Sequence, residues 1–251
     1  MKFLVFLLFV VSSFSENSNG IDHVVGIDLG TGYAGIGMMI DGNVEIVNFL
    51  DGPRIPACVA FRDGEELFGE EAKNQRCYNP ENTISEVKRF MGRNFNDKTL
   101  QDDAKHIMYT ITDYKNNPYI EFQVNSQRMK LKPQEICAKY LKYLKLQAED
   151  FLGESLSYAV ITVPTIFSEG QRRAVKEAGT LAGFEVLRIV NEQTAAAYAY
   201  KLDNVEDESY TIVIDVGITL DVVLYTVDQG IFEVIDTSGD AFLGAIRLIR
   251  E

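Results

Sequence analysis

The chain has 251 residues, enough for one large domain or two small ones with a substantial buried core. With 46% hydrophobic and 24% charged residues it has a globular composition, which excludes collagen-like, low-complexity and wholly disordered classes. Lys and Arg number 24 against 37 Asp and Glu, and the net charge of −13 argues against binding to nucleic acid or anionic membranes. Three widely spaced cysteines and two histidines predict neither a disulfide framework nor a histidine metal site.

The first 15 residues have the pattern of a secretory signal peptide. Lys2 precedes an uninterrupted apolar run at 3–11, and small residues follow at Ser13 and Ser15. The run is too short to span a bilayer as a helix, so we expect cleavage near Ser15 and no transmembrane segment. A buried N-terminal strand is the alternative interpretation. The expected mature protein belongs to the secretory pathway.

The next part of the chain predicts strands and short helices. Apolar runs separated by glycine turns predict three antiparallel strands at 24–29, 33–40 and 44–49. Helices are expected at 70–78 and 83–91, the second opened by a Thr83-x-x-Glu86 capping box. A Tyr-, Ile- and Val-rich stretch with two asparagine-containing turns predicts a small group of strands within 107–131.

A long amphipathic helix is expected from Pro133 to about residue 152, because apolar residues recur there at three- and four-residue spacing. Strands are expected at 158–163 and 184–190. Helices are expected at 168–182, opened by a Ser168-x-x-Gln171 cap, and at 192–201. The polar, acidic segment 204–209 predicts a boundary or linker.

The opening of the chain is repeated after this linker. Ile212-Val-Ile-Asp215-Val-Gly217 is similar to Val25-Gly-Ile-Asp28-Leu-Gly30, and each copy continues into a strand, a glycine turn and another strand. A strand that delivers Asp into a Gly/Thr turn places a carboxylate suited to hydrated Mg²⁺ beside backbone N–H groups that can bind phosphate. Two facing copies would hold a nucleotide from both sides; the alternative is a chance likeness of two hairpins.

Other phosphate-binding motifs fit less well. Gly30-Thr-Gly32-Tyr-Ala-Gly35 matches the dinucleotide fingerprint G-x-G-x-x-G, but that motif requires a following helix, and here a strand and an Asp-Gly hairpin follow. The chain has no protein-kinase lysine or catalytic-loop motif and no G-x-x-x-x-G-K-[ST] loop. The paired hairpins are therefore favoured over these motifs. A dinucleotide-dependent oxidoreductase remains the third of three functional hypotheses.

A further set of motifs is spread, in order, along residues 24–244. It comprises Gly26-Ile-Asp-Leu-Gly-Thr-Gly-Tyr33, Glu71-Ala-Lys-Asn-Gln75, Asn79-Pro-Glu-Asn-Thr83, Lys88-Arg-Phe-Met-Gly-Arg93, Ala159-Val-Ile-Thr-Val-Pro164, Leu187-Arg-Ile-Val-Asn-Glu-Gln-Thr-Ala-Ala-Ala197 and Ser238-Gly-Asp240. The set resembles the seventy-kilodalton heat-shock chaperone family and, with the leader, its endoplasmic-reticulum branch. That resemblance implies the endoplasmic-reticulum lumen as a compartment.

The resemblance implies an α/β fold of the actin-like, ribonuclease-H-like ATPase class, with a first lobe at 16–203 and the opening strands of a second lobe at 204–251. Its implied ligands are ATP or ADP with Mg²⁺, and its implied partners are J-domain co-chaperones and nucleotide exchange factors. The phosphate loops it implies are Gly30, Thr31, Gly32 and Tyr33, and Gly217, Ile218 and Thr219. The implied metal residues are Asp28 and Asp215, and the implied catalytic residues are Lys73, Glu192, Asp215 and Thr219.

The sequence departs from the family pattern at three places. The family's second loop reads Asp-Leu-Gly-Gly-Gly-Thr-Phe-Asp, whereas this chain has the shorter Asp215-Val-Gly-Ile-Thr-Leu-Asp221. Gly32 replaces a threonine, and Gln193 replaces a proline. The chain stops at Glu251, so we expect no complete second lobe, peptide-binding domain or retention signal. The leading hypothesis is a secretory-pathway chaperone ATPase domain with weakened activity, and the alternative is a non-enzymatic interaction lobe from a truncated gene product.

Overall fold

The computed structural model describes residues 23–50, 52–203 and 208–244. The signal peptide expected at 1–15 lies outside these residues, as does most of the expected linker at 204–209.

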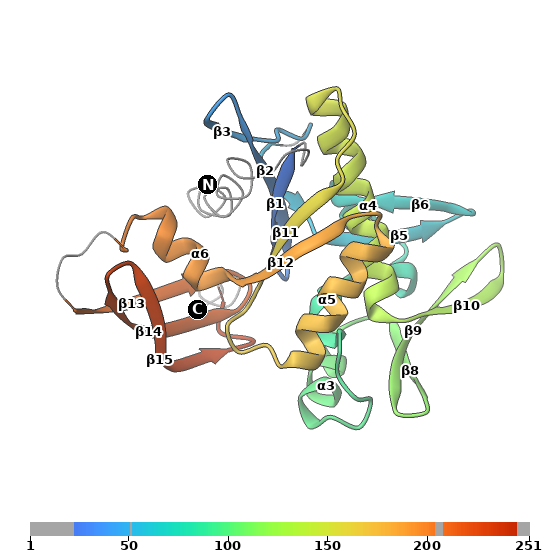
Figure 1. Ribbon diagram of the computed structural model, residues 1–251. Helices are drawn as coiled ribbons and strands as arrows, with labels where there is room; N and C mark the ends of the chain where they lie inside the picture. The colour runs from blue at the N-terminus through green and yellow to red at the C-terminus, as the bar shows by residue number, and fades with distance from the viewer. Residues whose placement is uncertain (1–22, 51, 204–207, 245–251) are drawn as a thin grey trace.

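A mixed six-stranded sheet forms the centre of the larger part of the chain (Figure 1). Its strands are β1 (Val24–Leu29), β2 (Tyr33–Ile40), β3 (Asn43–Ile46), β4 (Ile55–Pro56), β11 (Tyr158–Val163) and β12 (Glu185–Asn191). The order is β12-β11-β1-β2-β3, and β4 pairs with β2. β1 runs antiparallel to β2 and parallel to β11, with Ile27 opposite Ile161. The predicted strands are confirmed, although the third ends at Ile46.

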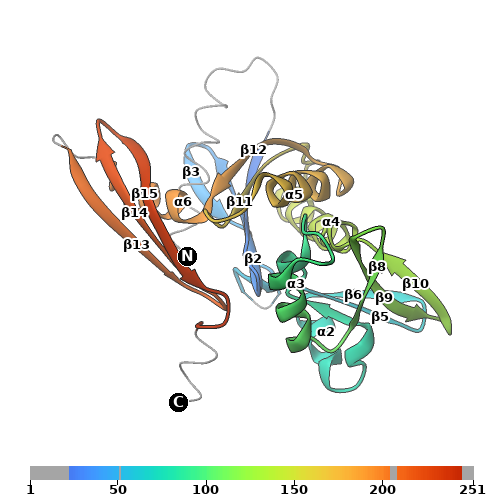
Figure 2. The ribbon, with the colours of Figure 1, turned by 90° about the horizontal axis from the view of Figure 1, so that it is seen from below.

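Two helices pack against each other beside this sheet, α4 (Pro133–Leu152) and α5 (Glu169–Leu181) (Figure 2). α4 buries Ile136, Tyr140 and Leu144 in the core, as the spacing of its apolar residues predicts. α5 contacts β11 and β12 and begins with the predicted cap. There the Gln171 N–H donates to the Ser168 hydroxyl at 3.3 Å, and the Ser168 N–H donates to Oε1 of Gln171 at 3.1 Å.

Two small antiparallel sheets lie beyond the central sheet. One has the order β6-β5-β7 and the other β10-β9-β8, which confirms the predicted strand group within 107–131. Their strands are β5 (Cys58–Arg62), β6 (Glu65–Phe68), β7 (Thr83–Ser85), β8 (Thr110–Tyr114), β9 (Asn117–Val124) and β10 (Gln127–Leu131). The rings of Phe61 and Phe122 stack between the sheets with centroids 3.9 Å apart. Short helical segments connect them: α2 (Gly69–Asn74), η1 (Gln75–Cys77), η2 (Pro80–Asn82), η3 (Val87–Phe90), α3 (Lys98–Asp103) and η4 (Ala104–His106).

The prediction of a helix at 83–91 is wrong. Thr83 begins β7, which pairs with β5, and its hydroxyl donates to the carbonyl of Asn79 at 2.7 Å instead of capping a helix. Glu86 has a left-handed backbone with φ of 56°, and its carboxylate accepts from Arg89 at 2.8 Å. Only the short turn η3 follows. Long-range strand pairing therefore overrides the local capping pattern.

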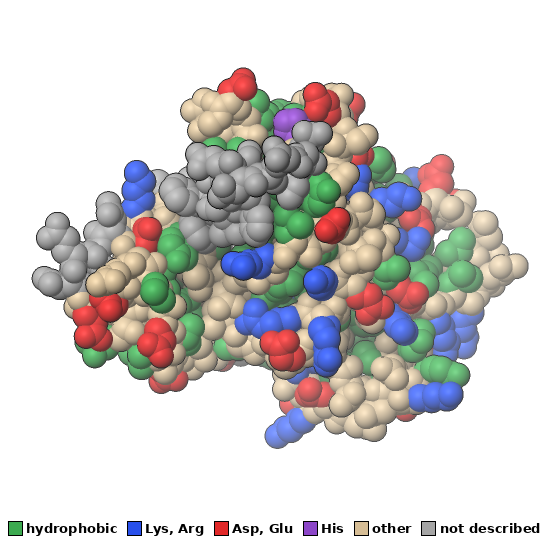
Figure 3. All heavy atoms as spheres, viewed as in Figure 1, with side chains coloured by type: hydrophobic (Ala, Val, Ile, Leu, Met, Phe, Trp, Pro, Cys, Tyr) green, Lys and Arg blue, Asp and Glu red, His purple; other side chains and the backbone are tan. Residues whose placement is uncertain are grey.

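The repeat forms a second sheet of three antiparallel strands, β13 (Ser209–Val216), β14 (Leu220–Asp228) and β15 (Ile231–Asp240). This strand–turn–strand–turn–strand arrangement is the one that the repeat predicts. α6 (Glu192–Ala199) covers one face, where Ala196 packs with Val213 and Tyr225. On the other face the side chains of Ile212 and Ile214 are exposed. Hydrophobic and acidic side chains interleave over the visible part of this sheet (Figure 3).

Candidate functional site

A cavity of about 550 Å³ lies where the turn after β1 approaches the turn between β13 and β14. Nearly all the site residues that the sequence analysis predicts line this cavity. The lining residues are Asp28, Gly30, Thr31, Gly32, Tyr33, Arg54, Glu192, Asp215, Val216, Gly217, Ile218 and Thr219. Of the predicted site residues, only Lys73 does not line the cavity.

Hydrogen bonds hold both turns in shape. The Gly30 N–H donates to the carbonyl of Tyr33 at 3.0 Å, and a Cβ at Gly30 would lie 2.6 Å from that oxygen, so the turn requires glycine. The carbonyl of Gly32 accepts from the N–H of Ala57 at 2.9 Å. In the second turn the Gly217 N–H donates to the carbonyl of Thr219 at 2.8 Å. Both turns are thus fixed surfaces of backbone polar groups, the kind of surface that binds anions.

Three carboxyl groups from distant parts of the chain converge on the cavity. Burial raises the pKa of Asp28, although the hydroxyl of Thr162 donates to its Oδ1 at 3.2 Å. Burial, with Asp28 and Asp215 nearby, raises the pKa of Glu192 to about 7. Burial, with Asp28 and Asp221 nearby, raises the pKa of Asp215 to about 6. The carboxyl groups repel one another, so the cavity favours a cation or protons.

A buried lysine that the sequence analysis did not single out stabilises this cluster. The side chain of Lys88 is 4% exposed, and its ammonium donates to the carboxylate of Glu192 and to the carbonyl of Leu29. Its charge lowers the pKa of all three carboxyl groups against the effect of burial. The only sequence signal is its place in the Lys88–Arg93 motif, because periodicity alone does not distinguish a buried lysine from a surface one.

Two cations lie close to the ring of Tyr33 at the edge of the cavity. The ammonium of Lys73 and the guanidinium carbon of Arg54 are each 5.7 Å from the centre of the tyrosine ring. The Lys73 ammonium donates to the Tyr33 hydroxyl at 3.5 Å and pairs with Glu70 at 2.9 Å, and the bond to Glu70 raises the pKa of Lys73. Lys73 is therefore at the rim, whereas Arg54, which sequence reasoning missed, lines the cavity.

The comparison with known families agrees with this geometry. The model of the family described as "Hsp70 protein" matches residues 24–248. The chain belongs to the Hsp70 family. Family membership implies the actin-like ATPase fold, with which the mixed α/β architecture is consistent, and an ATP-binding, chaperone ATPase-type function.

Members of the Hsp70 family generally bind ATP or ADP with Mg²⁺. In the described part of the chain no three His, Cys, Asp or Glu residues form a group that could hold a metal by themselves. Mg²⁺ needs fewer protein ligands, because it keeps several waters and binds one or two carboxylates together with substrate phosphates. Asp28 and Asp215 fit that requirement, since both line the cavity and, in addition to burial, the charge of Asp28 raises the pKa of Asp215, so the two carboxyl groups are close to each other.

Gln193, which stands where the Hsp70 pattern has proline, is fully buried behind this cluster. Its Oε1 accepts from the N–H and the hydroxyl of Thr165 at 3.2 and 2.9 Å, and these two donors set the orientation of the amide. The amide nitrogen therefore faces Asp215, whose Oδ2 is 3.5 Å away. This contact ties the segment after β11 to the end of β13.

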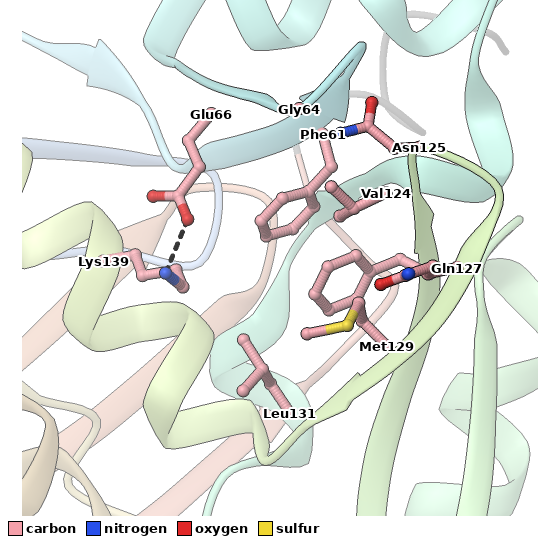
Figure 4. Close-up of a pocket in the computed structure, with 10 residues that line it drawn as sticks. Phe61, Gly64, Glu66, Val124, Asn125, Gln127, Met129, Leu131 and Lys139 are labelled. Carbon is pink, nitrogen blue, oxygen red and sulfur yellow. Dashed lines mark hydrogen bonds and ion pairs between the residues drawn. The ribbon is translucent and has the colours of Figure 1, made fainter.

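A second cavity of this Hsp70 chain, of about 430 Å³, lies between the β5–β6 hairpin, the β9–β10 hairpin and α4 (Figure 4). Its walls are mainly apolar, including Phe122, Met129 and Leu131, and its ionic contact is the pair of Lys139 and Glu66 at 2.6 Å. It contains none of the predicted site residues. No helix in the described residues is long and apolar enough to cross a membrane.

Proposed function

We propose that this chain is the nucleotide-binding part of a secretory-pathway Hsp70-type chaperone of the endoplasmic-reticulum branch, and that its Mg²⁺-nucleotide occupies the 550 Å³ cavity. One observation carries the proposal. The two copies of the repeated hairpin bring their Asp residues and their Gly/Thr turns to the same cavity, Asp28 and Gly30–Tyr33 from one copy and Asp215 and Gly217–Thr219 from the other. In this proposal residues 16–203 form the first lobe, and residues 204–251, to which the β13–β15 sheet belongs, begin the second.

Each group in the cavity has a role that its chemistry supports. Backbone N–H groups of the two turns hold phosphate oxygens, while Asp28 and Asp215 hold Mg²⁺ through its waters. The metal neutralises charge on the phosphates when it is bound. Glu192 orients water, and its position is set by Lys88. Lys73 and Thr219 complete the catalytic set, although the Thr219 hydroxyl donates to Asp221 at 2.8 Å and the Lys73 ammonium is paired with Glu70.

Binding and hydrolysis are weakened in this proposal by one substitution in each turn. Phosphoryl transfer depends on positioning and on charge stabilisation. Ile218 presents an aliphatic side chain where the family pattern has glycine, and Gly32 lacks the hydroxyl of the threonine that it replaces. Each lost charge-assisted hydrogen bond costs about 1.5–3 kcal/mol, or roughly a 10- to 150-fold loss of affinity.

Calorimetry of the full chain tests the nucleotide site. We expect Mg-ADP to bind measurably and NAD not to bind. Asp28→Asn removes the carboxylate that supports Mg²⁺ and should weaken Mg-ADP binding about tenfold or more. Asp41→Asn, in the exposed β2–β3 turn, is the matched control and should bind as the natural chain does. Absence of nucleotide binding by the natural chain would favour a non-enzymatic interaction lobe instead.

The secretory location rests on Lys2, the apolar run and the small residues Ser13 and Ser15. Mass spectrometry of protein purified from its native source should find an N-terminus near Glu16. An intact Met1 in a cytosolic fraction would contradict this location. J-domain co-chaperones and nucleotide exchange factors are the proposed partners, and stimulation of nucleotide turnover or release by either class would support them.

A further inference from the structure

The two turns of the cavity touch each other through one side chain. A Cβ at Gly32 would lie 2.1 Å from Cδ1 and 2.8 Å from Cγ1 of Ile218, so the isoleucine occupies the space that any other residue at position 32 would need. Gly32 is not in the left-handed region, so the close approach alone explains the glycine here. The two departures from the family pattern in the phosphate turns are therefore in direct contact.

Both partners of this contact are fixed in place. The Ala57 N–H binds the carbonyl of Gly32, and the Gly217–Thr219 hydrogen bond closes the turn around Ile218. On its other side, the backbone of Ile218 is packed against Gly244, where a Cβ would lie 1.9 Å from the Ile218 carbonyl oxygen. The isoleucine is thus an apolar bridge between the two turns, and its backbone is held on both sides.

We propose that Ile218 and Gly32 together set the length of the phosphate chain that the cavity accepts, so that it takes a nucleoside diphosphate in preference to a triphosphate. This inference rests on the proposed nucleotide site. The bridge separates the first turn, with its backbone N–H groups, from the second turn. A terminal phosphoryl group placed between the turns would face the aliphatic side chain of Ile218 and lose water there, and that side chain offers it no hydrogen-bond donor.

The charges around the cavity lead to the same preference. The cations Arg54 and Lys73 both lie beside Tyr33, on the side of the first turn. From the second hairpin, the lining residues are Asp215, Val216, Gly217, Ile218 and Thr219, which bring one acid and no cation. A diphosphate lying along the first turn therefore has a cation, Arg54, in the cavity wall on its side, next to the acid Asp28 that is proposed to hold Mg²⁺. An added phosphoryl group would approach the aliphatic side chain of Ile218, and the second hairpin lines the cavity with no cation that could compensate its charge.

Calorimetry with inorganic diphosphate and triphosphate, each with Mg²⁺, tests the preference without contributions from the base and ribose. The natural chain should bind diphosphate about tenfold more tightly or better, where tenfold corresponds to about 1.4 kcal/mol. Ile218→Ala should reduce this ratio to threefold or less. Ile212→Ala removes an exposed isoleucine of β13, the strand that leads into this turn, and should leave the ratio unchanged because Ile212 does not line the cavity. Mg-ADP and Mg-ATP should follow the same order.

Thermal unfolding measures the contact independently of any ligand. Gly32→Ala should lower Tm by about 2–12 °C in the natural chain, because the added methyl group overlaps Ile218. In the Ile218→Ala background the same change should shift Tm by less than about 2 °C. Equal shifts of Tm in the two backgrounds would show that Gly32 and Ile218 are not coupled by a contact.

The binding results distinguish a failure of the length preference from a failure of the proposed nucleotide site. Triphosphate binding as tight as diphosphate binding, or a ratio that Ile218→Ala does not change, would overturn the inference while leaving a nucleotide site in place. If the natural chain and Ile218→Ala bind no phosphate ligand and no nucleotide, the proposed function itself fails and the length preference falls with it.

Discussion

The exchange Lys88→Met tests whether one buried cation holds the carboxyl cluster together. Methionine keeps most of the length of the lysine side chain and removes its charge. The natural ammonium is almost fully buried and binds Glu192 and the carbonyl of Leu29. Without it, the carboxylates of Glu192 and Asp28 remain buried and lose their nearest positive charge.

Removing one partner of a buried ion pair costs about 3–5 kcal/mol, because the other charge stays buried and uncompensated. For a chain of this length, that loss corresponds to a decrease in Tm of about 6–20 °C. The loss should depend on pH. The pKa of Glu192, already about 7 because of burial, rises further when Lys88 is removed. At pH 5.5 the folded variant therefore carries a neutral Glu192, and its penalty should be less than about half of that at pH 8.

Urea unfolding at pH 8 and pH 5.5 measures both effects, and circular dichroism of the variant checks that it is folded before denaturant is added. Lys139→Met is the control, since Lys139 forms a partly exposed pair with Glu66 whose contribution is about 0–1 kcal/mol. A loss below about 1 kcal/mol at pH 8, or an equal loss at the two pH values, would refute the assigned role of Lys88.

Three further predictions concern stability. Gly92→Ala should lower the free energy of unfolding by at least about 2 kcal/mol more than Gly42→Ala, because both glycines have positive φ but only at Gly92 would a Cβ lie 2.4 Å from a backbone oxygen. Urea unfolding of the two variants measures the difference, and equal losses would contradict it. Ser168→Ala should lower the free energy of unfolding by about 0.5–2 kcal/mol through loss of the α5 cap, as the same assay can check, and no loss would argue against the cap. The folded pKa values of Glu192 and Asp215, about 7 and 6, lie above those of the unfolded chain, so the folded state binds more protons. The free energy of unfolding should therefore rise by about 1–2 kcal/mol as pH falls from 8 to 6, and a flat or opposite dependence would contradict these pKa values.

Local patterns predict most of the elements correctly where they agree with long-range packing. The α4 helix follows from its apolar spacing and its initial proline, and α5 follows from the Ser168–Gln171 cap. The Thr83-x-x-Glu86 pattern resembles such a cap equally well, yet Thr83 enters β7 because β5 offers it a strand partner. Nothing within ten residues of Thr83 encodes that partner.

The sequence predicts the two hairpins of the candidate site but not the residues that hold its side chains in place. The repeat of Asp and glycine places Asp28 and Asp215 near the ends of equivalent strands, and both line one cavity. Arg54, which lines the cavity, and Lys88, which binds Glu192 behind it, come from segments with no repeat and no distinctive spacing. The contact of Ile218 with Gly32 depends on how the two turns are placed in space, which neither sequence segment determines by itself.

The position of β1 between β2 and β11 has a consequence for synthesis of the chain. β2 follows β1 directly, but the parallel partner is completed only when residues such as Thr162 are made, and Thr162 is 133 residues beyond Leu29. At about 5–20 residues per second, translation takes about 7–27 s to cover that interval. During this time one edge of an apolar strand has no native neighbour, and such an edge can pair with other chains. That edge of β1 therefore stays open to pairing with other chains until β11 emerges.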